Sequence, residues 1–253
     1  MNEMLRRVFI RAHCPIEVAL TCVSWYITYP LSSRQLQELM TERGTSVDRS
    51  TILRWAIKLL PMLAAVCRHR KRPVGKRWRM DETYIKVAGQ RKYLYRAVDR
   101  SGATVDFLLR AKRDYAEVRA IIERAIKLHD LPGKVSNDKS GYNKAAIFSV
   151  QGDTGLAIPM RHSKYLNNIV ELDFHQIKRI TRPMLSFKNF RCAQIINAGF
   201  ETMHMICKGQ LADTKDEAAA AATHFNTLAF RSPHLSAIPL APSSYCDRTI
   251  FCR

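Results

Sequence analysis

The sequence predicts a mixed α/β fold preceded by a domain made only of helices. Apolar residues recur at helical spacing within residues 1–65, whereas short β-rich stretches alternate with amphipathic helical ones in residues 80–210. Between them, residues 66–79 hold seven Lys or Arg residues and no acid, which is typical of a basic linker. We therefore expect a helical domain, a linker and an α/β domain, followed by a weakly defined C-terminal tail over residues 211–253.

The chain is strongly basic, with a formal net charge of +19 in 253 residues. Such a charge favours polyanionic partners, and nucleic acid is a better candidate than an anionic membrane surface. No run of 18 uncharged apolar residues occurs, so we expect no membrane-spanning segment, and no signal peptide is recognisable. The seven cysteines include no C-x-x-C pair, which indicates free thiols in a reducing cytoplasm.

Within the helical domain, two short helices separated by a turn are expected over Tyr29–Leu60. Ser32 or Ser33 can cap the first helix, Gly44 can end it, and Asp48 or Ser50 can cap the second. This is the helix-turn-helix pattern, and an ordinary helical hairpin is the alternative. In a helix-turn-helix, the second helix would present four polar residues to DNA, namely Arg49, Ser50, Thr51 and Arg54.

The α/β domain opens with three strands in succession, joined by short turns that contain glycine. Helices and strands then alternate, which predicts a layered sheet flanked by helices. The expected strands are Trp78–Val87, Lys92–Asp99, Ala103–Arg110, Lys134–Asp138 and Gly155–Met160. The expected helices are Asp114–Asp130, residues 139–150 and Tyr165–Ile180.

Three acids fall where this order of elements would bring them together. Asp81 lies in the first strand, Asp138 ends the fourth strand, and Glu171 lies on the last helix. Three carboxylates repel one another at close range unless a cation neutralises them. Oxygen ligands with open positions suit Mg²⁺ or Mn²⁺, and two such ions can hold both sides of an in-line phosphoryl displacement. We therefore expect a two-metal site for phosphodiester chemistry.

A stripe of the last helix strengthens this expectation. Glu171, His175 and Lys178 are spaced i, i+4 and i+7, so they lie along one side of the helix and can face one DNA backbone. Asp173 is two residues on and points elsewhere. The alternative is a solvated charged face on which His175 is incidental.

Other acids in the same region have simpler interpretations. Glu82 points to the sheet face opposite Asp81, because side chains alternate along a strand. Asp99 is more simply a turn residue before Ser101 and Gly102. Asp106 lies in the third strand and has no predicted role.

At this level of detail the chain resembles a known family, the DDE-type transposases of bacterial insertion sequences. More narrowly, it is similar to the compact, cointegrate-forming family called Insertion Sequence six. The resemblance extends from about Cys14 to Gln210. It is carried by "CPIEVAL", "WYITYPLSSRQLQELMTERG", "RWRMDETYIKVAGQRKYLYRAVDRSGATVDFLL", "NDKSGYNKA", "RHSKYLNNIVELDFHQIKR" and "GFETMHMICKGQ".

The resemblance implies a fold and a set of functional residues. The fold would be an RNase H-like mixed five-stranded sheet flanked by helices, after an N-terminal helix-turn-helix domain that binds terminal inverted repeats. Asp81, Asp138 and Glu171 would be the catalytic acids that hold two Mg²⁺ or Mn²⁺ ions, and Lys178 would contact DNA near the cut end. The partners would be double-stranded DNA and at least one further copy of the chain, at the nucleoid of a bacterial cytoplasm.

One departure from the family leaves an alternative open. Asp138 and Glu171 are separated by 32 residues, slightly fewer than the family usually has, and the shortfall lies within Ile147–Ile158. The alternative is therefore a catalytically inactive remnant that binds DNA through residues 29–60 and acts as a repressor. A structure-selective nuclease with the same core is a third interpretation.

Overall fold

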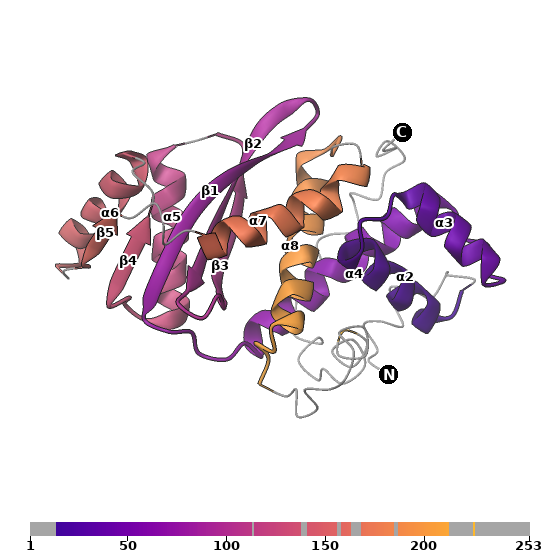
Figure 1. Ribbon diagram of the computed structural model, residues 1–253, viewed down its shortest axis with the longest axis horizontal. Coiled ribbons are helices and arrows are strands. Elements are labelled where there is room, and N and C mark those ends of the chain that lie inside the picture. Colours follow the sequence, from indigo (N-terminus) through magenta and orange to yellow (C-terminus); the bar gives the residue numbers. More distant parts are fainter. Residues whose placement is uncertain are drawn as a thin grey trace. The chain divides into compact units, whose positions relative to one another are not determined.

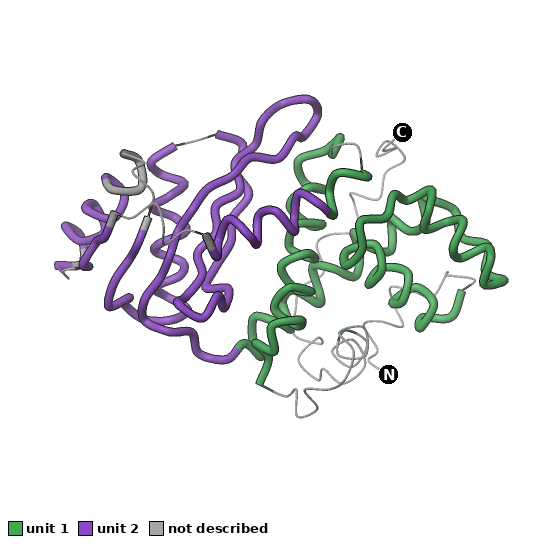
Figure 2. The backbone as a smooth tube through the Cα atoms, viewed as in Figure 1, with its two compact units in different colours: residues 1–71, 180–253 green, residues 72–179 purple. Residues whose placement is uncertain are grey.

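The chain divides into two compact units, each described here by itself. A computed structural model describes residues 14–112, 114–137, 141–155, 158–162, 168–184, 187–212 and 225. Residues 72–179 form one unit, and residues 1–71 with 180–253 form the other (Figures 1 and 2). The expected domain limits at residues 65, 79 and 210 stay predictions, and most of the expected tail lies outside the described residues.

The unit of residues 72–179 is built on one mixed sheet of five strands. Its strand order is β3-β2-β1-β4-β5, with antiparallel pairing among β1, β2 and β3 and parallel pairing of β4 with β1 and β5. This arrangement confirms the predicted fold class. The strands are β1 (Arg77–Val87), β2 (Gln90–Asp99), β3 (Thr104–Arg110), β4 (Lys134–Asn137) and β5 (Met160–His162).

Local sequence explains the antiparallel part. β1 and β2 are joined by a two-residue turn in which Ala88 and Gly89 both have positive φ, at 49° and 75°. Two central residues of this kind match the right-handed twist of a hairpin. At the next turn, the Asp99 carboxylate accepts hydrogen bonds from the backbone N–H groups of Ser101 and Ala103. These turns hold the three strands in register.

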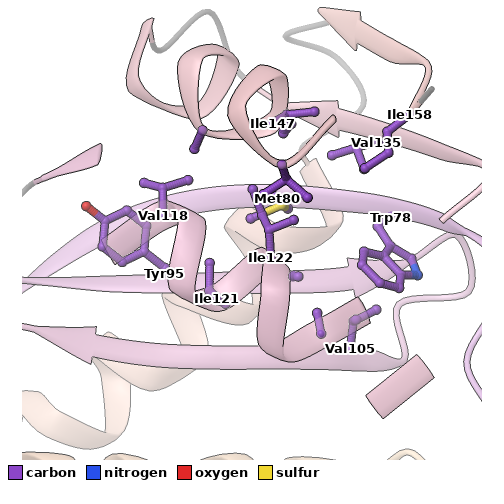
Figure 3. Packing of buried hydrophobic residues seen from close by; sticks show 14 residues of the cluster. Trp78, Met80, Tyr95, Val105, Val118, Ile121, Ile122, Val135, Ile147 and Ile158 are labelled. Atoms are coloured by element: carbon purple, nitrogen blue, oxygen red, sulfur yellow. The ribbon is translucent and has the colours of Figure 1, made fainter. Parts of the chain in front are cut away.

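Helices α5 (Tyr115–His129) and α6 (Gly141–Thr154) bury one face of this sheet. Trp78 and Met80 from β1 meet the α5 side chains Ile121 and Ile122 in one apolar cluster, and Ile147 adds the α6 side (Figure 3). The cluster is the main core of the unit. Helix α7 (Asn168–Thr181) meets the sheet through residues that are not part of this cluster.

The fifth strand is displaced from its predicted position. It covers Met160–His162, whereas Gly155–Met160 was expected. Gly155 ends α6 instead, because its N–H donates to the carbonyl of Gln151 at 2.9 Å and its φ is +66°. Pro159 has no N–H and contributes only its carbonyl oxygen, to the N–H of Val135, so the ladder begins after it.

The other unit consists of helices. They are α2 (Ile16–Thr28), α3 (Ser33–Glu42), α4 (Arg49–His69), a 3-10 turn η2 (Arg182–Met184) and α8 (Phe190–Cys207). Helix α8 packs closely on α4, since a Cβ added at Gly199 would lie 2.6 Å from Cδ1 of Leu60. Glycine at this position therefore permits the close approach of the two helices.

Two helices joined by a turn form where the capping signals predicted them, and their assignment as a helix-turn-helix stays a prediction. Ser32 caps α3 and forms a capping box with Gln35, and Asp48 caps α4. Gly44 lies in the turn between them with φ +76°. Helix α4 is long and apolar enough to cross a membrane by length and composition, but 56% of its most apolar window is buried, as in the core helix of a soluble protein.

Candidate active site

Asp81 lies where the sheet loses one of its strands. β4 pairs only with Arg77–Met80 of β1, so Asp81 is the first residue of β1 beyond the end of β4. Its side chain is half-buried, and its Oδ1 accepts the N–H of Glu82 at 2.8 Å. In the described part of the chain, the rest of β1 has β2 as its only neighbouring strand. Among the described residues, this leaves one edge of β1 without a partner strand from Asp81 onward.

Strand register places Asp81 and Glu82 on opposite faces, as predicted. Asp81 pairs with Arg96 of β2, and Glu82 pairs with Tyr95. Paired side chains share a face of the sheet. Because Tyr95 belongs to the apolar cluster under α5, Glu82 lies on the α5 face and Asp81 on the other face.

Helix α7 has a buried side and an exposed, charged flank. Its buried residues recur at helical spacing and are Val170, Asp173, Phe174 and Ile177. Glu171, His175 and Lys178 are all exposed. At about 100° per residue, their stripe lies roughly 110° round the helix from the buried side. The predicted stripe is therefore a flank that runs beside the sheet, and not the back of the helix.

A buried ion pair fixes α7 against the sheet next to Asp81. Arg96 is fully buried, and its guanidinium lies 3.2 Å from Oδ2 of Asp173. The same guanidinium donates to Oγ1 of Thr104 at 2.8 Å. Arg96 is the cross-strand partner of Asp81, and Asp173 is two residues beyond Glu171, so the pair brings Asp81 and Glu171 to one side of the sheet.

Our sequence interpretation missed this pair. Arg96 lies in the strand "KYLYRAVD", where a single charge is compatible with a solvent-facing position. The usable signal was in α7, where Asp173 falls on the same stripe as Phe174 and Ile177. An acid on an apolar stripe requires a buried partner.

A second contact fixes the far end of α7. Nζ of Lys178 lies 5.4 Å from the centre of the Tyr84 ring on β1. From Asp81 to Tyr84 the strand advances about 10 Å. From Glu171 to Lys178 the helix advances a similar distance, about 10 Å. Together with Asp173, which lies at Arg96 opposite Asp81, this contact indicates that α7 runs along β1 in the same direction.

The third predicted acid, Asp138, lies outside the described residues. It follows Asn137 directly, and Asn137 is the backbone partner of Met80, the residue before Asp81. Within the described ranges, no three His, Cys, Asp or Glu side chains are grouped closely enough to bind a metal ion.

The described donors fit a hard divalent cation. Asp81 and Glu171 offer carboxylate oxygens on one side of the sheet, and oxygen is the ligand atom that Mg²⁺ and Mn²⁺ prefer. The half-buried Asp81 and the exposed Glu171 leave room for water and substrate oxygens as further ligands. These residues could hold such ions.

The competing acids are used structurally. Asp99 is buried and accepts hydrogen bonds from Gly75 N and from Ser101 Oγ, besides those within its turn. Burial alone would raise the pKa of Asp99, but the hydrogen bonds from Ser101, Gly75 and Ala103 outweigh it and lower that pKa. Asp106 pairs with Arg124 of α5, with Nε and Oδ2 2.6 Å apart.

The predicted DNA-reading residues lie at the start of α4. Arg49, Ser50 and Arg54 are exposed, whereas Thr51 is half-buried and accepts a hydrogen bond from Arg54 at 2.9 Å. Ser50 donates to the capping carboxylate of Asp48 through both its N–H and its hydroxyl. A polar pocket of about 530 Å³ adjoins this end of α4, lined by Arg34, Gln37, Glu38, Thr41, Glu42 and Arg49.

Comparisons with known proteins agree on one class. Residues 75–210 match the protein family described as DDE domain. The chain is 37% identical over 195 residues to the transposase for insertion sequence-like element IS431mec from Staphylococcus aureus, a match that covers 76% of this chain and 85% of that protein. It is 36% identical, with the same coverage, to the transposase for insertion sequence element IS257 in transposon Tn4003 from the same organism.

Solved structures add a distant similarity in fold. The HTLV-2 integrase catalytic core domain in complex with magnesium is 17% identical and covers 53% of this chain and 88% of its own, with a TM-score of 0.37. A similarity of this degree carries no argument about function.

Proposed function

Because the chain belongs to the DDE-type insertion-sequence transposases of the Insertion Sequence six-like family, we propose that it cuts DNA at the ends of its element and joins the freed 3′-hydroxyls to target DNA. The observation that supports this proposal best is the placement of α7. The Arg96–Asp173 ion pair and the Lys178–Tyr84 contact hold Glu171 along the strand that carries Asp81.

In this proposal Asp81, Asp138 and Glu171 hold two Mg²⁺ or Mn²⁺ ions. When bound, the ions lower the pKa of the attacking water or 3′-hydroxyl and stabilise the departing oxygen. The protein supplies the carboxylates and keeps them fixed on a strand and an anchored helix. No nucleophilic side chain is required, because the attacking group is water or DNA.

Positive side chains would position the DNA for this reaction. Lys178 and His175 share the exposed flank of α7 with Glu171, so they can face the backbone on either side of the cut. At the other unit, Arg49, Ser50, Thr51 and Arg54 at the start of α4 would bind the terminal inverted repeats. The net charge of +19 favours association with DNA of any sequence and makes binding sensitive to salt.

Two DNA ends must be held together for joining, so at least two copies of the chain are expected on DNA. A bacterial cytoplasmic protein associated with the nucleoid would fit this role.

The test uses substitutions that keep side-chain shape. Asp81→Asn and Glu171→Gln should abolish strand transfer into a supercoiled plasmid in Mg²⁺ while leaving binding to the terminal repeat unchanged. Glu82→Gln is the matched control, because Glu82 adjoins Asp81 but lies on the α5 face, and it should retain strand transfer.

The outcomes separate the alternatives. Strand transfer by Asp81→Asn or Glu171→Gln at the wild-type rate would refute the site assignment. Binding without any transfer by the wild-type chain would favour the inactive remnant. Cleavage that ignores the terminal repeat would favour the structure-selective nuclease.

A further inference from the structure

Tyr84 is an exposed aromatic residue that holds two cations. Its side chain lies on β1, and 45% of the residue is exposed. Cζ of Arg91 lies 4.8 Å from the ring centre, and Nζ of Lys178 lies 5.4 Å from it. We call these three residues, Tyr84, Arg91 and Lys178, the Tyr84 platform. They come from a strand, the following strand and α7, so the fold builds this platform from separate elements.

The position of the platform relates it to the acids. Tyr84 is three residues after Asp81, so its Cα lies about 10 Å further along β1 and its side chain leaves the opposite face of the strand. Lys178 is seven residues after Glu171, which is also about 10 Å along its helix, and it reaches the Tyr84 ring from α7. Base pairs of B-DNA are 3.4 Å apart along the axis, so this span corresponds to about three base pairs.

The chemistry of the platform suits a phosphate backbone. Arg91 and Lys178 are exposed cations, and the aromatic ring attracts both of them through its negative π surface. Cations that are already ordered lose less side-chain entropy when they bind an anion. The neighbouring hairpin adds the exposed Lys86, the cross-strand partner of Arg91, on the same face.

We propose that the Tyr84 platform binds the backbone of the transposon-end DNA about three nucleotides from the cut phosphate. The proposal rests on the proposed function for its ligand, because it takes DNA as the substrate of the acids. Its new content is that the β1–β2 hairpin, through Tyr84 and Arg91, is part of the DNA site. Tyr84 acts as a positioning residue, which orients Arg91 and Lys178 without itself requiring a charge.

The experiment measures binding in a chain that cannot react. Glu171→Gln serves as the background, and the probe is a labelled duplex made from the terminal repeat that flanks the coding sequence. Arg91→Ala should weaken binding about tenfold and make the dependence of log K on log salt shallower by about 0.9, as expected for one lost phosphate contact. Tyr84→Ala should weaken binding similarly, and Tyr84→Phe should not, because the ring is retained.

A chemical change in the DNA locates the contact. The probes are duplexes that each carry one neutral methylphosphonate in place of a phosphate. The Glu171→Gln chain should bind most weakly to the duplex whose methylphosphonate lies about three nucleotides from the cut. Arg91→Ala should remove that sensitivity and leave it intact at other positions. Lys127→Ala is the matched control, since Lys127 is an exposed cation on α5 and is not part of the Tyr84 platform, and it should change neither affinity nor salt slope.

The results are decisive in both directions. Unchanged affinity and salt slope in both Arg91→Ala and Tyr84→Ala would overturn the proposal, even if strand transfer confirms the catalytic acids. Loss of the third-position sensitivity in Arg91→Ala would support it, even if the wild-type chain proved inactive in strand transfer. Arg91 is exposed, so its substitution tests the proposal even if Tyr84→Ala unfolds, which a thermal melt would reveal.

Discussion

Two buried aspartates, Asp106 and Asp173, each pair with an arginine, and they do so on opposite faces of the same sheet. Arg124 reaches Asp106 from α5, and its side chain is 45% exposed. Arg96 reaches Asp173 of α7 from within the sheet, and its side chain is 0% exposed. Both pairs join a helix to a strand, but only the second excludes water from the cation.

The difference shows how the two helices are held. Helix α5 rests on the apolar cluster of Trp78, Met80 and their neighbours, so its ion pair is an addition at the rim. Helix α7 carries its ion pair on its buried side, between Val170 and Ile177. A buried pair adds little stability over apolar packing, but its geometry is strict. We infer that the α5 face supplies most of the stability and that the α7 face supplies a defined position for Glu171.

The largest expected effect comes from breaking the buried pair. Asp173→Leu removes the carboxylate that lies 3.2 Å from the fully buried Arg96 guanidinium, which should cost about 3–5 kcal/mol in the free energy of unfolding. Chemical denaturation measures this change. Strand transfer should also be lost, at temperatures where the variant is still folded.

A double variant separates stability from position. Arg96→Met with Asp173→Leu replaces both charges by apolar groups and should recover most of the stability. Strand transfer should stay low, because the directional ion pair that fixes the rotation of α7 next to Asp81 is then missing. Full recovery of strand transfer would contradict our comparison of the two faces.

The next effect should come from the apolar face. Ile121→Ala on α5 leaves a cavity in the core cluster and should cost about 3 kcal/mol, near the middle of the range for such deletions. Below its melting temperature the variant should transfer strands at nearly the wild-type rate. A large loss of activity in the folded variant would show that the α5 face also positions the site.

Asp99 is a buried acid whose described hydrogen-bond donors are backbone N–H groups and a hydroxyl, and not an arginine. Asp99→Asn should cost about 1–3 kcal/mol, because the amide cannot accept all the donors that now reach the carboxylate. The pKa of Asp99 is lowered in the fold, so its contribution is fully present above the ordinary value of 3.8 and is lost as pH falls through the folded value. Unfolding curves of wild type and Asp99→Asn should therefore converge only below about pH 4.

The smallest effect is expected at the rim. Arg124→Ala should cost about 1 kcal/mol, between the values for exposed and buried pairs, because water can reach the vacated space. The Phe107 N–H still donates to Asp106 at 2.9 Å. Thermal melts in low and high salt would measure the stability cost of Arg124→Ala. A cost as large as that of Asp173→Leu would contradict the difference that we infer between the two faces of the sheet.

The sequence predicted those parts of the fold that short-range signals control. Alternating residues and glycine turns predicted β1, β2 and β3 to within two residues, and capping residues predicted α3 and the start of α4. β5 was misplaced, because a three-residue strand carries almost no periodic signal and Pro159 shifts its start. The packing of α8 on α4 depends on a contact between Gly199 and Leu60, residues far apart in the chain.

The candidate site also combines features that local sequence signals predict with features that only the tertiary fold sets. Spacing predicted that Glu171, His175 and Lys178 share a flank of α7, and alternation predicted that Glu82 turns away from Asp81. Neither signal contains the partner of Asp173, because pairing across a sheet face is set by the tertiary fold. The convergence of Asp81, Asp138 and Glu171 stays a prediction.

Beyond Met80, the described strands cover only one edge of β1, and this has a consequence for handling the protein in the absence of DNA. Backbone groups of an unpaired strand edge can template the addition of a strand from another molecule, which leads to aggregation. The exposed Lys86 near the hairpin tip is the kind of charge that discourages such pairing. Lys86→Val should therefore lower solubility in purified preparations, and short duplex DNA added during purification should restore it.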